Sequence, residues 1–290
     1  MAYQPLHSAA ALLGGWDGAR PPDSPVVSQR PAAGVLPRGP AAGPWPEWAR
    51  PQLGAAVNLA ATAADRMSVA GLLYRNWFNP ETGDARGVPG GTPLAGLYRE
   101  SHAGSGTRVG RGDLSVVARQ DVLRAGGWWR TWGEYWTPGG RRASVRLLLT
   151  PRADALGEFV ATVTGRLLPT RIPWSLACAT DPWRIARSGC AVLDLPGLES
   201  IPGGLLADLG PLLRPVTPPL CLPVAPGVGA AQYPDNGMTF GEHRCHLVAL
   251  GLRHRRRARD PLSSIAAVFS AYGIDPAAPY RNTLRQLPHV

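Results

Sequence analysis

Apolar side chains recur along this chain with two different spacings, and each spacing predicts one kind of element. Apolar residues three or four positions apart are typical of a helix with one buried face, whereas alternating apolar and polar residues are typical of a strand. The first pattern predicts helices at residues 53–73, 152–168, 198–213 and 240–252, with a last helix that ends at Gly273. The second predicts strands at residues 114–122, 128–136 and 143–150. Residues 172–179 should form another strand and the apolar run 191–195 a buried one, and Asp181-Pro182 should begin a short helix.

The order of these elements indicates an α+β fold. The connecting loops are too irregular for a doubly wound sheet, so we expect a mixed, mostly antiparallel sheet packed with helices. One main domain should cover residues 53–290, a length that can bury a full core. Residues 1–52 are rich in Pro, Gly and Ala and should form an irregular N-terminal arm. Its tryptophans Trp16, Trp45 and Trp48 favour anchoring on a partner or on the fold itself.

Arginine carries all of the permanent positive charge of the side chains. The 290 residues contain 30 arginines, no lysine and 20 acidic residues, which gives a formal net charge of +10. Such a surface attracts phosphate, nucleic acid or acidic peptides, although the same residue usage is also typical of a high-GC coding sequence. Because a guanidinium group stays charged at any working pH, these side chains can hold anions but cannot readily give up a proton.

The densest positive run, Arg253 to Arg259, has two interpretations. It fits a solvated loop between helices, and it also fits a surface that holds an acidic leader peptide or a partner protein. Non-specific attraction to nucleic-acid phosphate stays open. The sequence contains no recognised nucleic-acid module, so we expect no specific nucleic acid as a partner.

Metals, cofactors and membranes are not expected from the sequence. Cys178, Cys190, Cys221 and Cys245 lack the spacing of a metal site, which favours buried free thiols. The glycine-rich pieces have no nucleotide-loop context, so no cofactor is expected. No apolar run approaches the ~20 residues that span a bilayer, and no signal peptide is visible. We therefore expect a cytoplasmic protein.

Several segments, taken in order, resemble a known family. They are Ile172-Pro173-Trp174 to Asp181-Pro182, Cys190 to Pro196, Ala225 to Gly229, Phe240 to Cys245, and Gly273 to Asn282. Their order and spacing resemble the Hop-A (HrmA-like) type III effector family, and the cluster Tyr74 to Phe78 is similar to an aromatic motif of that family. The resemblance covers roughly residues 53–283.

The resemblance implies an activity, because relatives occur in actinobacterial gene clusters for ribosomally made peptides such as class V lanthipeptides and thioamitides. There it implies a lyase-like subunit that acts with a separate kinase-like subunit. The kinase phosphorylates Ser or Thr of a precursor peptide, and the lyase eliminates phosphate to leave dehydroalanine or dehydrobutyrine. The implied partners are the kinase-like protein and the precursor peptide, with its leader and phosphorylated core. The resemblance also implies lysines near positions 177 and 222, where this chain has Ala177 and Leu222.

Phosphate elimination needs a base for the Cα proton, cations for the phosphate and a donor for the carbonyl oxygen, which selects candidate residues. His243 lies in the best-matched motif and could be the base or the acid, because an imidazole titrates near neutrality. The other candidates are Tyr74 and His102 for proton transfer, and Arg244, Arg146 and Arg75 for phosphate. Three of them also have a purely structural interpretation: His243 as a partly buried helix residue hydrogen-bonded to the Pro-rich loop before it, and Arg75 and Arg146 as solvated or salt-bridged surface residues.

Three functions therefore remain open from the sequence. The chain could be a phosphoserine/phosphothreonine lyase, or a non-catalytic subunit that binds the peptide or supports the kinase-like partner. A third hypothesis is a secreted effector that acts on a host protein.

Overall fold

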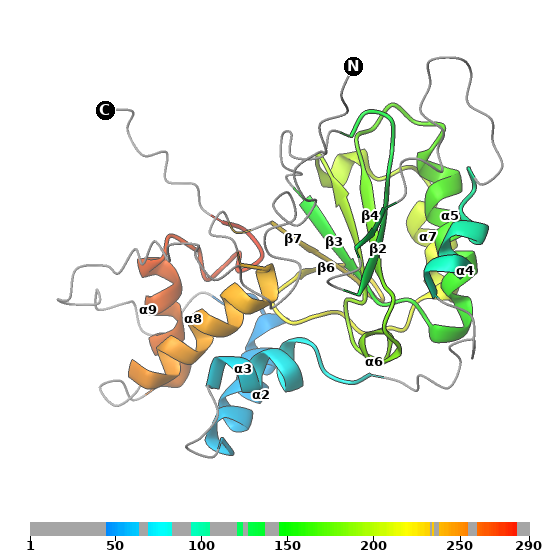
Figure 1. The fold of residues 1–290 in the computed structure, drawn as a ribbon. Helices are drawn as coiled ribbons and strands as arrows, with labels where there is room; N and C mark the ends of the chain where they lie inside the picture. The colour runs from blue at the N-terminus through cyan, green and yellow to red at the C-terminus, as the bar shows by residue number, and fades with distance from the viewer. Residues whose placement is uncertain are drawn as a thin grey trace, which may run out of the picture. The chain divides into compact units, whose positions relative to one another are not determined.

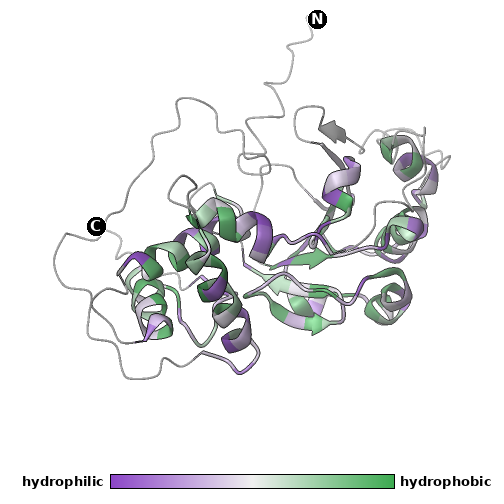
Figure 2. Ribbon diagram, turned by 90° about the horizontal axis from the view of Figure 1, so that it is seen from below, coloured by the Kyte–Doolittle hydropathy of each residue, from purple (hydrophilic) through white to green (hydrophobic). Residues whose placement is uncertain are grey.

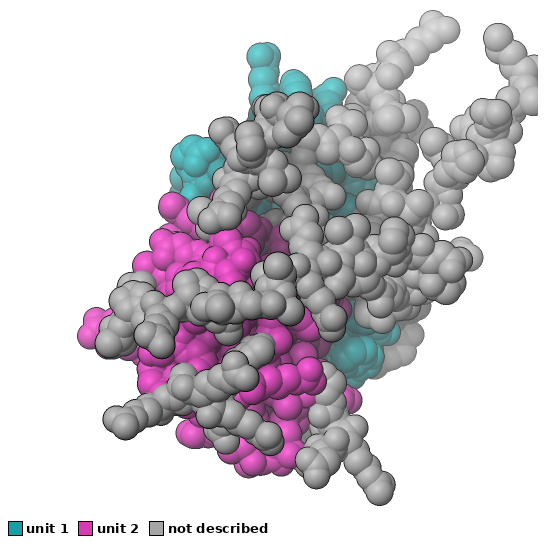
Figure 3. All heavy atoms as spheres, turned by 90° about the vertical axis from the view of Figure 1, so that its left-hand side faces the viewer, with its two compact units in different colours: residues 1–18, 81–217, 223–230 teal, residues 19–80, 218–222, 231–290 magenta. Residues whose placement is uncertain are grey.

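The computed structural model describes residues 45–63, 69–82, 94–104, 121–123, 127–136, 145–232, 234, 238–254 and 260–282. The chain divides into two compact units (Figure 3). The sheet unit contains Glu81–Thr217 and Pro223–Ala230, and the helical unit contains the described residues up to Pro80, Pro218–Leu222 and those from Ala231 onward. Most of the predicted N-terminal arm, residues 1–44, lies outside the described residues.

A seven-stranded sheet forms the centre of the sheet unit (Figure 1). Its strands are β1 (Asp121–Leu123), β2 (Trp128–Trp132), β3 (Val145–Leu149), β4 (Ser175–Ala179), β5 (Ala191–Leu195), β6 (Leu222–Ala225) and β7 (Val228–Ala231). They lie in the order β1-β2-β4-β5-β3-β7-β6. β2 pairs with β4, β4 with β5, and β5 with β3, each antiparallel. The predicted α+β fold with a mostly antiparallel sheet is confirmed.

One face of this sheet is apolar and is covered by helices. The covering helices are α4 (Leu94–Ser101), α5 (Leu156–Leu167) and α7 (Leu205–Leu209) (Figure 1). Trp129 of β2 faces them and packs against Tyr98 of α4, with 5.4 Å between the ring centroids. Figure 2 shows hydrophobic residues along the strands, as expected for strands in a core. Because side chains alternate along each strand, the intervening residues all point to the opposite face.

The helical unit is built around one long helix, α8 (Phe240–His254). The other elements of this unit are α2 (Ala49–Ala61), α3 (Val69–Leu73), a π-helix at Tyr74–Phe78, and α9 (Pro261–Ala271). Thr239 and Glu242 form a capping box at the start of α8, since the Thr239 backbone N–H donates to Glu242 Oε2 and the Glu242 N–H donates to Thr239 Oγ. Asp260 caps α9 with its side chain alone, which accepts from the Leu262 and Ser263 backbone N–H groups.

Trp45 anchors the start of the described chain on this unit. Its ring meets Phe269 edge-on at 5.2 Å, and its indole N–H donates to the Leu262 carbonyl at 3.2 Å. For Trp45, anchoring on the fold itself is confirmed. α2 begins at Ala49, four residues before the predicted domain boundary at residue 53.

Several stretches differ from the predicted pattern. The predicted helix at residues 198–213 is broken into two 3₁₀ turns, Leu198–Ser200 and Gly210–Leu212, around α7, because Pro202 and Pro211 interrupt it. The hairpin β6–β7 lies where no strand was predicted, and it turns at Gly227, whose φ of 76° suits glycine. α4 was not predicted. The remaining short elements are Ala153–Ala155 and α6 (Pro182–Ile185), the latter at the predicted Asp181-Pro182 start.

None of the helices in the described part of the chain is long and apolar enough to cross a membrane.

The close packing of α8 on α9 yields a stability prediction. A Cβ atom at Gly251 would lie 2.6 Å from the Ile265 Cα, so Gly251→Ala should destabilise the protein by ~1–3 kcal/mol although alanine is the better helix former. In α2, Gly54 has open space around it, so Gly54→Ala should stabilise by ~0.5–1 kcal/mol. Urea unfolding of both variants measures these changes, and a Gly251→Ala protein as stable as Gly54→Ala would contradict the packing.

Candidate functional site

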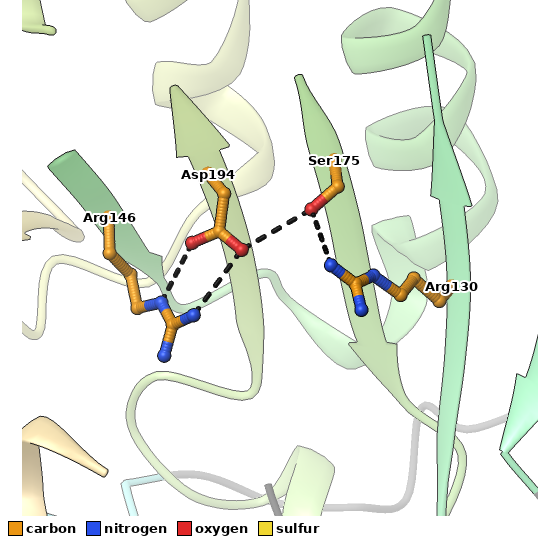
Figure 4. A network of polar contacts seen from close by, with 4 residues as sticks. All are labelled: Arg130, Arg146, Ser175 and Asp194. Carbon is orange, nitrogen blue, oxygen red and sulfur yellow. Dashed lines mark hydrogen bonds and ion pairs between the residues drawn. The ribbon is translucent and has the colours of Figure 1, made fainter. Parts of the chain in front are cut away.

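The opposite face of the sheet carries a cluster of four polar residues on four adjacent strands. Arg146 of β3 binds Asp194 of β5 through two hydrogen bonds, Nε to Oδ1 at 2.8 Å and Nη2 to Oδ2 at 3.3 Å. Ser175 of β4 donates to Asp194 Oδ2 at 3.3 Å, and Arg130 Nη2 of β2 donates to Ser175 Oγ at 3.1 Å. Figure 4 shows this network, which we call the sheet cluster.

The register of the strands brings these residues together. Arg146 pairs with Asp194, and Asp194 pairs with Ser175, so three of the four residues form one row across the sheet. Ser175 also pairs with Trp132, and Arg130 lies two residues before Trp132 on the same face of β2. The Arg130 side chain therefore reaches Ser175 diagonally.

Burial and charge make the sheet cluster suited to an anion. Asp194 is only 4% exposed, and a buried carboxylate needs a partner of opposite charge, which Arg146 supplies in a bidentate pair. Counted over the four residues, two guanidinium groups face one carboxylate. Planar guanidinium groups match the oxygens of phosphate. Here arginines from β2 and β3 bind Ser175 and Asp194, which are hydrogen-bonded to each other.

Aromatic rings surround Arg130. Trp128 and Trp132 flank it on the same face of β2, and the Trp136 ring centroid lies 5.9 Å from Arg130 Cζ. Guanidinium groups stack favourably on aromatic faces because they are weakly hydrated and positively charged. The rings therefore help to hold Arg130 in its position beside Ser175.

His102, a predicted proton-transfer residue, lies on the opposite, helix-covered face. Its Nδ1 accepts from the Gly104 backbone N–H at 3.0 Å, and its Nε2 lies 2.9 Å from Thr131 Oγ1. The neutral ring must therefore carry its proton on Nε2. Burial lowers the pKa of His102 to about 4. The sheet separates His102 from the sheet cluster, so the structure does not bring it to Arg146.

His243, the first candidate for the base, is buried in the helical unit. Its Nδ1 accepts a hydrogen bond from Arg244 Nη1 at 2.8 Å, which leaves the ring proton on Nε2. Burial, together with the positive charge of Arg244, lowers the pKa of His243 to about 3. At neutral pH the ring is uncharged, but the nitrogen that could accept a proton is already engaged.

Arg244, a predicted phosphate ligand, instead holds the C-terminal segment onto α8. Its side chain is fully buried, and it donates to the Pro279 carbonyl at 2.7 Å, the Arg281 carbonyl at 2.9 Å and Asn282 Oδ1 at 2.9 Å. The Phe240 ring lies 4.6 Å from its Cζ. Burial lowers the pKa of Arg244 to about 9. This geometry does not support phosphate binding, because a phosphate would have to displace three protein acceptors.

The two other candidates, Tyr74 and Arg75, lie in the π-helix of the helical unit. Tyr74 stacks on Phe78 with 6.0 Å between ring centroids, and Arg75 is exposed. The helical unit therefore contains Tyr74, Arg75, His243 and Arg244, while Arg146 and His102 lie in the sheet unit.

Sequence reasoning found Arg146 but missed its partners in the sheet cluster. Asp194 offered a signal, since a lone carboxylate in the buried strand Ala191–Leu195 needs a cation. Arg130 offered another, because on strand β2 it lies on the same face as Trp128 and Trp132, between the two rings. Ser175 offered none.

The four cysteines are free and buried, as predicted. Burial raises the pKa of the Cys190 thiol to about 11, so this thiol stays protonated at neutral pH. Within the described ranges, the structure contains no group of three or more His, Cys, Asp or Glu residues that could hold a metal ion.

Two solved structures share this fold. The chain is similar to an effector protein from Pseudomonas syringae pv. tomato strain DC3000, with a TM-score of 0.56, 13% identity, and coverage of 80% of this chain and 96% of that chain. It is also similar to an effector protein from Pseudomonas syringae pv. syringae strain 61, with a TM-score of 0.53, 14% identity, and coverage of 79% and 97%. At such low identity the likeness extends to the fold alone. No curated protein matches the chain.

The family is shown by a direct sequence match. The model of the HopA1 effector protein family matches residues 130–281, a span that contains Arg130, Arg146, Ser175 and Asp194. This span is more than half of the 290 residues. The expected family resemblance is therefore confirmed, and the chain belongs to the HopA1 effector protein family.

Proposed function

We propose that the chain is a phosphate-eliminating subunit of a peptide dehydratase. Its substrate is a ribosomally made precursor peptide that carries phosphoserine or phosphothreonine, and its product carries dehydroalanine or dehydrobutyrine. A separate kinase-like protein would supply the phosphorylated peptide. The observation that carries the proposal is the sheet cluster, where arginines from two strands flank Ser175 and Asp194 (Figure 4).

The reaction determines what these residues must do. A base removes the Cα proton, its electron pair forms the Cα=Cβ bond, and the Cβ–O bond breaks so that phosphate leaves with the oxygen. Negative charge increases on that oxygen as the bond breaks, and fixed cations stabilise it. Arg130 and Arg146 perform this task in the proposal, and their permanent charge suits it.

Proton transfer requires a different group. Arginine cannot be the base, because it remains protonated. His243 is withdrawn as the base, since Arg244 occupies its Nδ1 and its proton lies on Nε2. His102 is withdrawn because it is buried on the opposite face of the sheet.

The state of both histidines favours a second candidate function. In that alternative the chain is a non-catalytic subunit that binds the phosphorylated peptide, or supports the kinase-like partner, through the same sheet cluster. The observation that favours it is that both predicted proton-transfer histidines are buried and have lowered pKa values.

Phosphopeptide binding separates these functions. The full chain is titrated with a synthetic core peptide in phosphorylated and unphosphorylated forms. The mass of the phosphorylated peptide after incubation is then measured by mass spectrometry. We expect Arg130→Gln to weaken binding of the phosphorylated form ~10-fold or more, since one charge-assisted contact contributes ~1.5–3 kcal/mol. The double variant Arg146→Gln/Asp194→Asn, which removes both charges of this ion pair, should have a similar effect.

The matched control is Arg166→Gln. This arginine pairs with Asp208 on the helical layer and its side chain is 49% exposed, so the variant loses the same charge away from the sheet cluster. Loss of one phosphoric acid from the peptide supports the lyase, and binding without loss supports the non-catalytic subunit. Equal affinity for both peptide forms in the wild-type chain rejects the lyase and the phosphopeptide-binding subunit.

The buried histidines also predict a pH dependence of stability. Unfolded histidine has a pKa near ~6.5, whereas the folded pKa is about 4 for His102 and about 3 for His243. Between these values the unfolded chain binds protons that the folded chain does not. The free energy of unfolding is therefore highest above a pH of ~6.5, and it decreases as the pH falls toward 4. Each histidine contributes a slope of up to ~1.4 kcal/mol per pH unit.

Urea unfolding at several pH values measures this slope. His243→Asn should reduce it, with stability at pH 5 falling less from its pH 7 value than in the wild-type chain. An unchanged slope in the variant would show that His243 is protonated equally in both states. A folded His243→Asn protein that binds the phosphopeptide but no longer eliminates phosphate would restore His243 as a catalytic residue.

A further inference from the structure

We propose that the helical unit contains a further peptide-binding site, an apolar pocket with Arg253 at its rim, which we call the helix pocket. The site takes an acidic peptide segment. One apolar side chain of the segment enters the pocket, and a neighbouring carboxylate pairs with Arg253. The choice of a peptide as the occupant rests on the proposed function, in which the leader of the precursor peptide has no assigned site.

The helix pocket is formed where the end of α2, the start of α3 and the last turns of α8 meet (Figure 1). Its lining consists of Ala60, Ala61, Val69, Ala249, Leu252 and Arg253. The three helices pack against one another in pairs, so all sides of the pocket belong to the helical unit. The alanine side chains are too short to fill the space between the helices, which leaves the pocket open.

The size and the lining of the pocket suit one apolar side chain. Its volume is about 150 Å³. An apolar cavity of ~150 Å³ can hold a benzene-sized group, so the pocket has room for one leucine or phenylalanine side chain. Ala61 on one side is exposed, whereas Ala249 is only 5% exposed. A side chain that enters from solvent therefore meets an apolar floor, and removal of its apolar surface from water favours binding.

Arg253 gives the rim of the pocket a permanent positive charge. It is exposed on the last turn of α8, where its guanidinium also offsets the partial negative charge of the helix end. It begins the densest positive run of the sequence, since residues 253–259 contain five arginines and no acidic residue. Such a run attracts carboxylates and repels basic peptides. Charge therefore selects an acidic segment, and the pocket selects an apolar side chain within it.

The apolar lining favours a peptide over nucleic acid as the occupant. Single-stranded nucleic acid is held by cations together with aromatic rings on which the bases stack. Among the described residues that line the helix pocket, none is aromatic. Aliphatic side chains at Val69 and Leu252 instead match an aliphatic or aromatic side chain of a peptide.

The test uses a short synthetic peptide that carries one leucine among glutamates, titrated into the full chain by calorimetry. One matched peptide has serine in place of the leucine, and another has glutamines in place of the glutamates. We expect the serine form to bind ~10-fold more weakly, because it buries no apolar side chain. The glutamine form should also bind more weakly, and its difference from the glutamate form should decrease at high salt.

Substitutions in the chain test the two parts of the site. Ala60→Leu fills the pocket and should weaken binding of the leucine form ~10-fold; Ala60 is not fully buried and leucine is a good helix former, so the variant should fold. The control Ala55→Leu lies on the exposed side of α2, outside the lining, and should change binding less than ~2-fold. Arg253→Gln should weaken binding ~3-fold, as expected for an exposed ion pair, whereas Arg171→Gln, at an exposed arginine of the sheet unit, should not.

The outcomes separate this inference from the proposed function. Equal binding of the leucine and serine forms shows attraction of any polyanion and overturns the inference. Lack of binding of the leucine form to the wild-type chain, or equal binding of it to Ala60→Leu and Ala55→Leu, overturns it as well. Loss of its binding in Ala60→Leu, with binding of the phosphorylated core peptide retained, supports the inference. A wild-type chain that prefers the leucine form but does not distinguish the phosphorylated from the unphosphorylated core peptide keeps the helix pocket and rejects the proposed phosphate site.

Discussion

The antiparallel pairing of β2, β4, β5 and β3 in a single register is the constraint on which the sheet unit depends. Alternation along these strands sends Trp129, Leu176, Leu193 and Leu147 toward the helices and sends Arg130, Ser175, Asp194 and Arg146 to the opposite face. A shift of one residue in any pair would put a charge under the helices, which is far costlier than the loss of a hydrogen bond. The same register therefore places the apolar side chains in the core and the polar side chains in the sheet cluster.

The motif that most resembles the family has a structural explanation in this chain. Glu242 completes the capping box of α8, Gly241 leaves room for the Phe78 ring, and Arg244 binds the C-terminal segment. The buried Arg244 guanidinium is held by neutral acceptors and by the Phe240 ring. The same sequence pattern would suit a phosphate site, because His and Arg beside each other serve both purposes. Only burial and hydrogen-bond partners distinguish the two.

Local chemistry predicted much of the fold, and long-range pairing decided the rest. The strand at Ala191–Leu195 was predicted residue for residue, since an apolar run bounded by turns has few alternatives. β6 and β7 were missed because prolines 223 and 226 suggest a loop, whereas sheet pairing tolerates them beside a turn. In the sheet cluster, Arg146 meets Asp194 across 48 residues of sequence, through a strand order that does not follow the chain. The spacing of residues along the sequence cannot predict such a contact.

The absence of lysine divides the proposed chemistry into two tasks. Ala177 stands where the family resemblance implies a lysine, and the register places it directly opposite Arg130 on the same face of the sheet. A lysine there could hold phosphate and, after losing its proton, also act as a base. The Arg130 guanidinium lies on the adjoining strand and retains the positive charge, but it cannot give up a proton. In the proposed function, phosphate binding therefore belongs to the arginines of β2 and β3, and removal of the Cα proton belongs to a different group.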